Sequence, residues 1–512
     1  MQKANEVLLF YADNIFMKRP VNNEQHTSSI HAYLTKQNIV CRSLYNIEAE
    51  TLMKEIEIAQ PKYLGIGINF LSKLSQLKEF ISKLKEKVND CMIISYGLFA
   101  NSDYDYLNKY FYNEFDFVVR GNPVVEFYNI VINNDKRIDK TKIILRSNAK
   151  VNINKLCAPA KNIKNELNTM ASRGCLNNCI FCEEKPMYKG YEYRPVQSVV
   201  EEIKQHVYSS DLDFDCWVFF SDLDFLSITE MDKTWIDNLC NELEKMPRKI
   251  KFTFQTRADR ISLNKENLKM LKKVGLEGIS LGIESGSNEV LSKFNKCIQS
   301  NIVNYEALQV LQEIKILYKI NFIMYEPMTS LENIKENLEF FDKVQFPKGT
   351  IPSQPLVSYL SKLIVLHGSS CYNYYIKKYS IDFKLNNYIV EYDFKDERMN
   401  LYYSYVLQWR DKIKKIVKEH YRLLNYVLYN MVNQKDSLII QHIGFQIRKI
   451  DLEFMKELLQ VVSYNGDANK TIEEFYSLFE DIYDRMKRLG CYNMSNKIQF
   501  RGWHGPMNSL ND

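Results

Sequence analysis

The stretch SRGCLNNCIFC, residues 172–182, places three cysteines in one short segment with the spacing C-x3-C-x2-C. Thiolates are the usual protein ligands of iron-sulfur clusters, so Cys175, Cys179 and Cys182 are candidate ligands of such a cluster. Three ligands leave one iron of a four-iron cluster without a protein ligand, and that iron is free to take a substrate or cosubstrate. The segment therefore predicts a cluster with an open coordination position.

Two other interpretations of the cysteine segment have to be weighed. A structural zinc site needs a fourth ligand, usually from a second C-x2-C pair or from histidines, and the sequence nearby has neither. A disulfide is the other alternative, but 11 cysteines, an odd number, mostly isolated inside apolar runs, are typical of a reducing compartment. The iron-sulfur interpretation is favoured over both.

Length and charge limit the remaining possibilities. A chain of 512 residues, 46% of them hydrophobic, is long enough for two or three domains. Its 68 basic and 63 acidic residues give a net charge of only +5, which does not favour nucleic acid as a partner. No apolar run approaches the roughly 20 residues that span a bilayer, and residues 1–6 do not resemble a signal peptide. We therefore expect a cytoplasmic protein without a membrane partner.

Short apolar runs alternate with amphipathic stretches in the first third of the chain, a pattern that predicts parallel strands joined by helices. We expect residues 1–150 to form an open, Rossmann-like α/β domain. Ligands of such sheets bind beyond the carboxyl ends of the strands. The expected strands are Val7–Tyr11, Ile39–Ser43, Tyr63–Ile68, Met92–Tyr96 and Phe115–Val119, and the expected ligand-binding loops are 12–17, 69–72, 97–100 and 120–123.

Residues 151–370 repeat a strand-then-helix pattern, which predicts a partial (βα)6 barrel with functional residues at the carboxyl ends of its strands. Polar side chains follow several of these strands, so we expect them to share a rim with the cysteines. The expected strands are 168–171, 217–220, 250–255, 278–283, 320–324 and 356–360. From residue 371 to residue 512 the pattern becomes helical and predicts a cap or substrate-selecting domain.

The cysteine segment, with Phe181 directly before its third cysteine, resembles the signature of the radical S-adenosylmethionine (SAM) enzymes. In that family the open iron of a 4Fe-4S cluster chelates SAM. The rim segments 220–225, 256–257 and 282–287 resemble their counterparts in the branch that carries an N-terminal cobalamin-binding domain, and the likeness covers about residues 5–370. The resemblance implies a SAM site made by Phe181, Asp222, Arg257, Glu284, Ser285, Tyr325 and Glu326.

Two of these residues also have a purely structural interpretation. Asp222 is placed to cap the helix that follows it, and Arg257 is placed to pair with Asp224 or Glu284. The sequence does not decide between the structural and the SAM-binding roles.

The N-terminal segments resemble the cobalamin-binding domain of the same branch, with two departures. Residues 12–17 lack the D-x-H-x-x-G pattern whose histidine ligates cobalt elsewhere, and Tyr96 stands where a glycine is common and would crowd a corrin. The resemblance implies cobalamin bound without that histidine; the alternative is an inherited sheet with an empty or peptide-binding mouth. The implied cobalamin-side residues are Gly67, Asn69, Gly97, Leu98, Arg120 and Gly121.

The resemblance implies reductive cleavage of SAM to a 5′-deoxyadenosyl radical, which modifies an unactivated carbon of a natural-product or peptide substrate. The leading hypothesis is cobalamin-dependent C-methylation, with electrons from a reductant such as flavodoxin or ferredoxin. The alternatives are a cobalamin-independent radical cyclisation, epimerisation or rearrangement, and a non-catalytic cobalamin or iron-sulfur sensor.

Overall fold

The fold is taken from a computed structural model of the chain. It describes residues 6–16, 25–45, 47–69, 74–88, 90–101, 111, 113–133, 144–146, 166–184, 187–188, 190–210, 215–296, 299–346, 348–350, 360–384, 389–428 and 433–489. The chain divides into two compact units, one of residues 1–255, 270–276 and 364–391 and one of residues 256–269, 277–363 and 392–512. Among the described residues, no helix has both the length and the apolar character needed to cross a bilayer.

The first unit begins with a six-stranded sheet in the order β2-β1-β3-β4-β5-β6, in which every neighbouring pair is parallel. Its strands are β1 (Val7–Tyr11), β2 (Cys41–Leu44), β3 (Tyr63–Gly67), β4 (Met92–Tyr96), β5 (Phe117–Arg120) and β6 (Ile144–Arg146). All five residues of β1 and of β3 are buried. Strands that are buried on both faces consist of continuous apolar runs, and such runs in the sequence predicted these strands.

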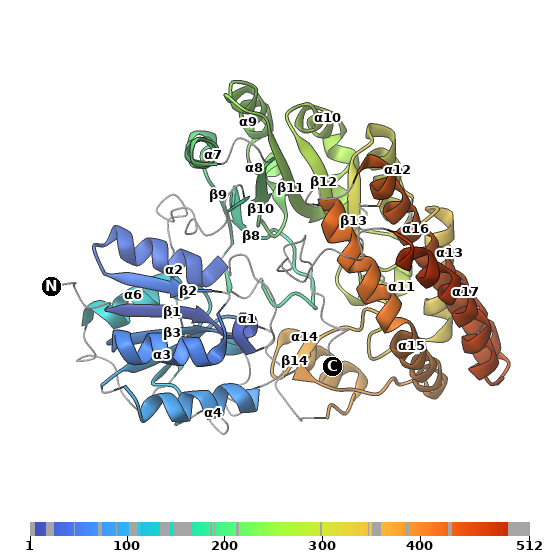
Figure 1. The fold of residues 1–512 in the computed structure, drawn as a ribbon, viewed down its shortest axis with the longest axis horizontal. Coiled ribbons are helices and arrows are strands. Elements are labelled where there is room, and N and C mark those ends of the chain that lie inside the picture. Colours follow the sequence, from blue (N-terminus) through green and yellow to red (C-terminus); the bar gives the residue numbers. More distant parts are fainter. Residues whose placement is uncertain are drawn as a thin grey trace. The chain divides into compact units, whose positions relative to one another are not determined.

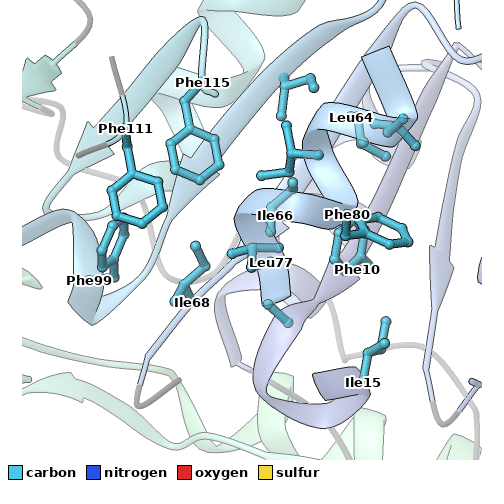
Figure 2. Close-up of a cluster of buried hydrophobic side chains, with 14 of the residues drawn as sticks. Phe10, Ile15, Leu64, Ile66, Ile68, Leu77, Phe80, Phe99, Phe111 and Phe115 are labelled. Carbon is cyan, nitrogen blue, oxygen red and sulfur yellow. The ribbon is translucent and has the colours of Figure 1, made fainter. Parts of the chain in front are cut away.

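Helices cover both faces of this sheet (Figure 1). On one face α3 (Ala49–Ala59) and α4 (Leu74–Lys85) bury apolar residues against the strands, and Figure 2 shows Leu77 and Phe80 of α4 beside Phe10 and Ile66. On the other face α2 (Gln25–Lys36) and α6 (Pro123–Asn133) do the same. The apolar residues of α4 recur at helical spacing, so one stripe of the helix faces the sheet.

The remainder of the first unit carries the cysteine segment. Strands β7 (Glu166–Thr169), β10 (Cys216–Phe220) and β11 (Ile250–Arg257) are parallel, with β10 between β7 and β11. The short strands β8 (Ser172–Gly174) and β9 (Tyr191–Tyr193) form an antiparallel pair on either side of the cysteines. The other elements are α7 (Val196–Ser209), η4 (Phe225–Ser227), α8 (Ile228–Met231), α9 (Trp235–Glu244), β14 (Val365–Leu366), α14 (Ser370–Tyr379) and β15 (Ile389–Val390).

The second unit continues the strand-then-helix pattern. Strands β12 (Leu276–Glu284) and β13 (Leu317–Phe322) are parallel, and helices α11 (Asn288–Lys293), α12 (Asn301–Ile314) and α13 (Leu331–Lys343) follow them in the chain. The boundary between the units cuts through β11 and through α10 (Lys265–Lys273). Short 3-10 turns are formed by η1 (Leu98–Asn101) in the first unit and by η5 (Ala258–Arg260) and η6 (Ser262–Asn264) in the second. A capping box starts α13: Ser330 Oγ accepts from Asn333 N at 3.2 Å, and Asn333 Oδ1 accepts from Ser330 N at 3.1 Å.

The C-terminal region is helical, as expected. Helices α15 (Glu397–Leu428), α16 (Gln434–Ser463) and α17 (Asn469–Lys487) pack against one another, and they run from brown to red in Figure 1. Trp409 of α15 anchors their core, because its ring stacks on Phe454 with centroids 4.1 Å apart and meets the edge of Phe479 at 5.2 Å. Stacked and edge-to-face aromatic pairs of this kind stabilise a core beyond the area they bury.

The predicted strands agree with the structure, with shifts of a few residues at their ends, and the α/β class is confirmed. Residues 12–16 form a short helix, α1 (Ala12–Phe16), rather than a loop, because Ala12 and Ile15 pack into the sheet core. Strand β6 was not predicted. The expected sixth barrel strand falls largely on residues 351–359, outside the described residues, and the domain limits at 150 and 370 stay a prediction.

Candidate functional site

The cysteine segment lies on a turn that backbone geometry fixes at both ends. Gly174 has φ +84°, and a Cβ there would lie 2.0 Å from the Gly190 carbonyl oxygen, so the close approach of β8 to β9 requires glycine. On the other side, Cys182 N donates to Cys179 O at 3.3 Å. This backbone presents the three cysteines from one loop.

The cysteine side chains suit cluster ligation. All three are partly exposed, and they are not in disulfides. Cys175 Sγ accepts from Asn177 N at 3.4 Å and from Asn177 Nδ2 at 3.6 Å. Hydrogen bonds to the sulfurs stabilise thiolates and tune the potential of a cluster. Within the described residues no three His, Cys, Asp or Glu side chains converge on a single metal ion.

Asp222 supports the start of this loop. Its carboxylate is buried and accepts from Ala171 N at 3.0 Å, from Ser172 N at 2.5 Å and from Ser172 Oγ at 2.5 Å. Burial raises the pKa of Asp222 to about 6, although these hydrogen bonds act in the opposite direction. The suggestion that Asp222 caps the following helix is therefore wrong: it fixes the backbone three residues before Cys175.

Asp224 and Tyr191 complete the polar surroundings of the loop. Asp224 Oδ2 accepts from Ser227 Oγ at 2.7 Å and from Asn177 Nδ2 at 3.4 Å. Tyr191 lies close enough to Asp222, Asp224 and Cys175 for their charges to add to the effect of burial, which raises its pKa well above the ordinary range. Asn177 is thus shared between the first cysteine and an aspartate that lies 47 residues away.

The residues expected on the cobalamin side come together at the carboxyl ends of β1, β3 and β4. Asp13 Oδ2 accepts from Asn69 N at 2.9 Å, and Asn69 Oδ1 accepts from Leu98 N at 2.9 Å. Gly97 has φ +102°, and a Cβ there would lie 2.4 Å from Ile68 O. The turn after β4 therefore requires a glycine and places its backbone beside Asn69.

The other cobalamin-side residues lie around the same strand ends. Arg120 Nε donates to Ala100 O at 2.8 Å, and Gly121 has φ +75°. Gly67 ends β3, and a Cβ there would lie 3.0 Å from the ring of Tyr96. The Tyr96 side chain is fully buried in the core facing α2 and α6, where its hydroxyl pairs with Thr27 Oγ1 at 2.8 Å. Tyr96 is therefore a core residue.

In the second unit, Glu284 ends β12 in an unusual conformation. Its φ is +64°, and the register between β12 and β13 shifts at residues 282–284. The carboxylate Oε1 accepts from Lys296 Nζ at 3.0 Å, and Lys296 also donates to Gly282 O at 3.1 Å. Left-handed backbone at a non-glycine residue costs about 1–3 kcal/mol and is concentrated at functional sites.

Arg257, at the end of β11, is paired with a residue that the sequence did not suggest. Its Nε donates to Asp259 Oδ1 at 2.8 Å and its Nη2 donates to Asp259 Oδ2 at 3.1 Å, so the bond is bidentate. Within the second unit, the described contacts of Arg257 are therefore with Asp259 and not with Glu284, and the alternative pairing with Asp224 stays a prediction. A carboxylate two residues along the same chain reaches the guanidinium more easily than the distant candidates.

Ser285, Tyr325 and Glu326 are all buried. Ser285 Oγ donates to Asn337 Oδ1 at 2.8 Å, and Gly286 N donates to the same oxygen at 2.7 Å. Glu326 Oε1 accepts from Lys293 Nζ at 3.3 Å, and its Oε2 accepts from a backbone N–H at 2.7 Å. The sequence gave no sign of Asn337, which lies on α13, 52 residues from Ser285.

Tyr325 is enclosed by aromatic rings. Its ring lies 4.9 Å from that of Tyr403 and 6.0 Å from that of Phe394, and burial raises its pKa well above the ordinary value. The structure thus gathers the expected residues into groups within each unit: the cysteine loop and the sheet mouth in the first, and Arg257, Glu284, Ser285, Tyr325 and Glu326 in the second.

Residues 170–341 match a family model described as the radical SAM superfamily. The chain contains a radical SAM domain. This confirms the resemblance inferred from the cysteine segment, and the matched residues include all three cysteines together with Asp222, Arg257, Glu284, Ser285, Tyr325 and Glu326.

Among curated proteins, the chain is similar to the 4′-phospho-dehydrooxetanocin synthase of Priestia megaterium, with 24% identity over 367 residues. The match covers 62% of this chain but only 48% of the synthase, so the chain spans about half the length of that relative. The synthase supports a relationship over the matched residues and leaves the activity of this protein to be proposed.

Two solved structures share the fold of this chain. The cobalamin-dependent SAM radical enzyme OxsB, with aqua-cobalamin and SAM bound, superposes with a TM-score of 0.73 at 18% identity, over 94% of this chain and 79% of OxsB. The radical SAM methyltransferase TsrM from Kitasatospora setae, with tryptophan substrate and a SAM analogue bound, gives a TM-score of 0.52 at 13% identity, over 66% and 71%. The OxsB match supports the predicted fold: an α/β N-terminal domain, a radical SAM barrel and a helical C-terminal region.

Proposed function

We propose that this protein is a radical SAM enzyme that holds a 4Fe-4S cluster on Cys175, Cys179 and Cys182 and modifies an unactivated carbon of a natural-product or peptide substrate by cobalamin-dependent C-methylation. The observation that carries the proposal is the loop of three reduced cysteines inside a radical SAM domain. When bound, the cluster supplies the electron that cleaves SAM to a 5′-deoxyadenosyl radical.

The protein's own residues prepare the cluster loop. Asp222 holds the backbone at Ala171 and Ser172, and Asn177 donates to the Cys175 sulfur and to Asp224. These bonds restrict the loop before a metal arrives, so less ordering is required when the cluster assembles.

Glu284, Ser285 and Glu326 are the residues proposed to bind SAM, with Phe181, Arg257 and Tyr325 in supporting positions. Lys296 donates a hydrogen bond to the buried Glu284 carboxylate and restricts its orientation, which suits this carboxylate to accept further hydrogen bonds from an ammonium or a hydroxyl group. Asn337 fixes the Ser285 hydroxyl, and Lys293 does the same for Glu326. Arg257 is already neutralised by Asp259, so its role is to position neighbouring groups.

Cobalamin is proposed to bind at the carboxyl ends of the N-terminal sheet, beside Gly67, Asn69, Gly97, Leu98, Arg120 and Gly121. These residues fit a large ligand, because Gly97 and Gly121 turn the chain without side chains and the Asp13–Asn69–Leu98 bonds stabilise the rim. The helix α1 contains no histidine, so no cobalt ligand is assigned there. The OxsB structure, whose fold this chain shares, was determined with aqua-cobalamin bound.

A cofactor count tests this proposal. The protein is reconstituted without oxygen using iron, sulfide and hydroxocobalamin, desalted, and analysed for iron and cobalt beside its ultraviolet-visible spectrum. About four irons and one cobalt per chain are expected, because a 4Fe-4S cluster and one corrinoid account for them. Iron without cobalt contradicts the cobalamin part, and neither metal contradicts both parts.

One observation favours a second reaction. The curated relative whose match covers 62% of this chain is a synthase, whereas the match to a curated methylase covers only 30% of it. A radical cyclisation, epimerisation or rearrangement without methyl transfer is therefore the second candidate. Incubation with substrate and SAM labelled in its methyl group distinguishes the two, because only C-methylation transfers the label to the product.

The substrate and partners follow from the same proposal. We infer a small-molecule or peptide substrate and an external one-electron reductant such as flavodoxin or ferredoxin, with no role for nucleic acid or membrane. We also infer a cytoplasmic location, since a cluster with an open iron is sensitive to oxygen.

A further inference from the structure

The outward face of α14 carries an open cavity of about 730 Å³. Its lining residues are Gly368, Ser370, Asn373, Tyr374, Lys377 and Lys378. Because helical residues three or four positions apart are neighbours, Ser370, Asn373 and Lys377 share one side of the helix. Ile376, three residues after Asn373, adds an apolar side chain that is 37% exposed. The face therefore combines polar, aromatic, apolar and basic groups that are open to a partner.

The positive charge of this face is not compensated within the described part of the chain. Helix α14 contains Lys377 and Lys378 but no acidic residue, and neither lysine forms an ion pair among the described residues. Lys378 Nζ instead donates to Tyr374 Oη at 3.2 Å and lies 5.2 Å from the centroid of that ring. In contrast, Lys83 of α4 pairs with a glutamate one turn earlier at 2.6 Å. The two lysines of α14 are available to an acidic partner.

The N-terminus of α14 contacts the cysteine loop. Ser369 is the N-cap of the helix, and its hydroxyl lies within hydrogen-bonding range of the Glu183 carboxyl. Glu183 directly follows Cys182, a proposed cluster ligand. Gly368 and Ser370, the residues on either side of Ser369, both line the cavity. One end of the cavity therefore lies beside the segment that is proposed to hold the cluster.

Packing in the first unit fixes α14 next to this segment. Leu366 of β14 and Met187, which lies five residues after the third cysteine, are buried in the same apolar core. On the inner side of α14, Cys371 and Tyr375 are buried. All of these residues belong to the first unit, as do the three cysteines. The contact between α14 and the cysteine loop is thus part of one packed body.

We propose that this face of α14 docks a small acidic protein that carries one electron and passes it to the cluster. The inference rests on the proposed function. The step moves one electron from the reduced centre of the carrier to the cluster proposed on Cys175, Cys179 and Cys182, and no bond is made or broken. Unpaired lysines complement an acidic surface and speed its encounter with the protein. Tyr374 and Ile376 suit the centre of a small, transient interface.

Direct binding tests the inference without relying on turnover. Oxidised flavodoxin and oxidised ferredoxin are each titrated into cluster-loaded protein, and Kd is measured by isothermal titration calorimetry. Lys377→Glu/Lys378→Glu reverses the charge of the face, and Lys377→Gln/Lys378→Gln removes it. Lys36→Glu/Lys249→Glu is the matched control, because both lysines are exposed in the same unit and form no ion pair among the described residues.

We expect the charge reversal to raise the Kd of the more tightly bound carrier at least about 10-fold at about 50 mM salt, because two attractive contacts become repulsive. The glutamine variant should fall between this protein and the wild type, and the control should stay within about twofold of the wild type. At about 500 mM salt the differences should shrink, because salt screens exposed charges. Equal Kd values for the wild type and the charge-reversed protein overturn the inference.

Formation of 5′-deoxyadenosine separates this inference from the proposed function. With a limiting concentration of reduced carrier, the charge-reversed protein should be at least about fivefold slower than the wild type. With dithionite, which needs no docking surface, the two proteins should form 5′-deoxyadenosine at similar rates. Equal losses with both reductants would indicate damage to the cysteine loop and overturn the docking assignment.

Two results for the wild-type protein complete the test. Wild-type protein that is active with dithionite but binds neither carrier contradicts this inference alone. Wild-type protein with a full iron content that is inactive with dithionite and with both carriers contradicts the proposed function.

Discussion

Asp451 of α16 gives a prediction whose magnitude follows from its surroundings. Its side chain is buried and its Oδ1 accepts from Trp409 Nε1 at 2.7 Å. Burial raises the pKa of Asp451 from 3.8 to about 7, and the indole hydrogen bond opposes this shift only in part. Arg448 lies one turn earlier on the same helix, and the hydroxyls of Tyr402 and Tyr325 are close enough for the charge of Asp451 to affect their pKa values.

The sign of the pH dependence follows from which state holds the proton. Between about pH 4 and pH 7 the unfolded chain has lost the Asp451 proton while the folded protein keeps it. Stability is therefore greatest below pH 4 as far as this group is concerned, and falls by about 1.4 kcal/mol per pH unit until the folded protein also ionises. The total loss is about 4 kcal/mol by neutral pH. Asp451→Asn keeps the acceptor for Trp409 and removes the ionisation.

This local stability is measured by hydrogen exchange of the backbone amides of α15 and α16. The exchange is followed by mass spectrometry and corrected for the intrinsic effect of pH on the exchange rate. At pH 8 Asp451→Asn should raise protection by up to about 1,000-fold over the wild type, the equivalent of 4 kcal/mol. At pH 5 the gain should be at least 10-fold smaller. Asp484→Asn, which removes an exposed ion pair with Lys487 on α17, should change little at either pH. Weaker protection of Asp451→Asn at pH 8 would mean that Arg448 stabilises an ionised Asp451, and would refute the reasoning.

Three further predictions concern the candidate site. Cys179→Ala should retain almost no iron after reconstitution while its circular dichroism is unchanged; a normal iron content would contradict cluster ligation. Gly97→Ala should lower the melting temperature by several degrees, about 1–3 kcal/mol, because φ is +102° and a Cβ would lie 2.4 Å from Ile68 O; an unchanged melting temperature would contradict the strained turn. Lys296→Met should destabilise the protein by about 3–5 kcal/mol in denaturant titrations, because Glu284 loses its partner at 3.0 Å; adding Glu284→Gln should restore much of this, and additive losses would contradict the pairing.

Local sequence patterns predicted the sheet of the first unit well. Val7–Tyr11 and Met92–Tyr96 were predicted with their observed limits, because strands buried on both faces are uninterrupted apolar runs between polar loops. The pattern failed where few residues carried it. Strand β6 has three residues, and the five residues of α1 combine a polar Asp13 with a buried Ile15, which gives no clear period.

The residues of the candidate site were easier to find than their contacts. The cysteines are recognisable because their spacing in the sequence is itself the signal. The partner of Ser285 is Asn337, 52 residues away, and the backbone held by Asp222 lies about 50 residues before it. Such pairs depend on how strands and helices are packed, and no local pattern records them.

The most direct test of the central claim is the formation of 5′-deoxyadenosine. Reconstituted wild-type protein and Cys179→Ala are incubated without oxygen with SAM and dithionite, and the product is quantified by mass spectrometry. Wild-type protein should form 5′-deoxyadenosine in a time-dependent way, and Cys179→Ala should form none above the level seen without protein. Wild-type protein that carries about four irons and still leaves SAM intact, with and without candidate substrates, would contradict the account and favour a non-catalytic sensor.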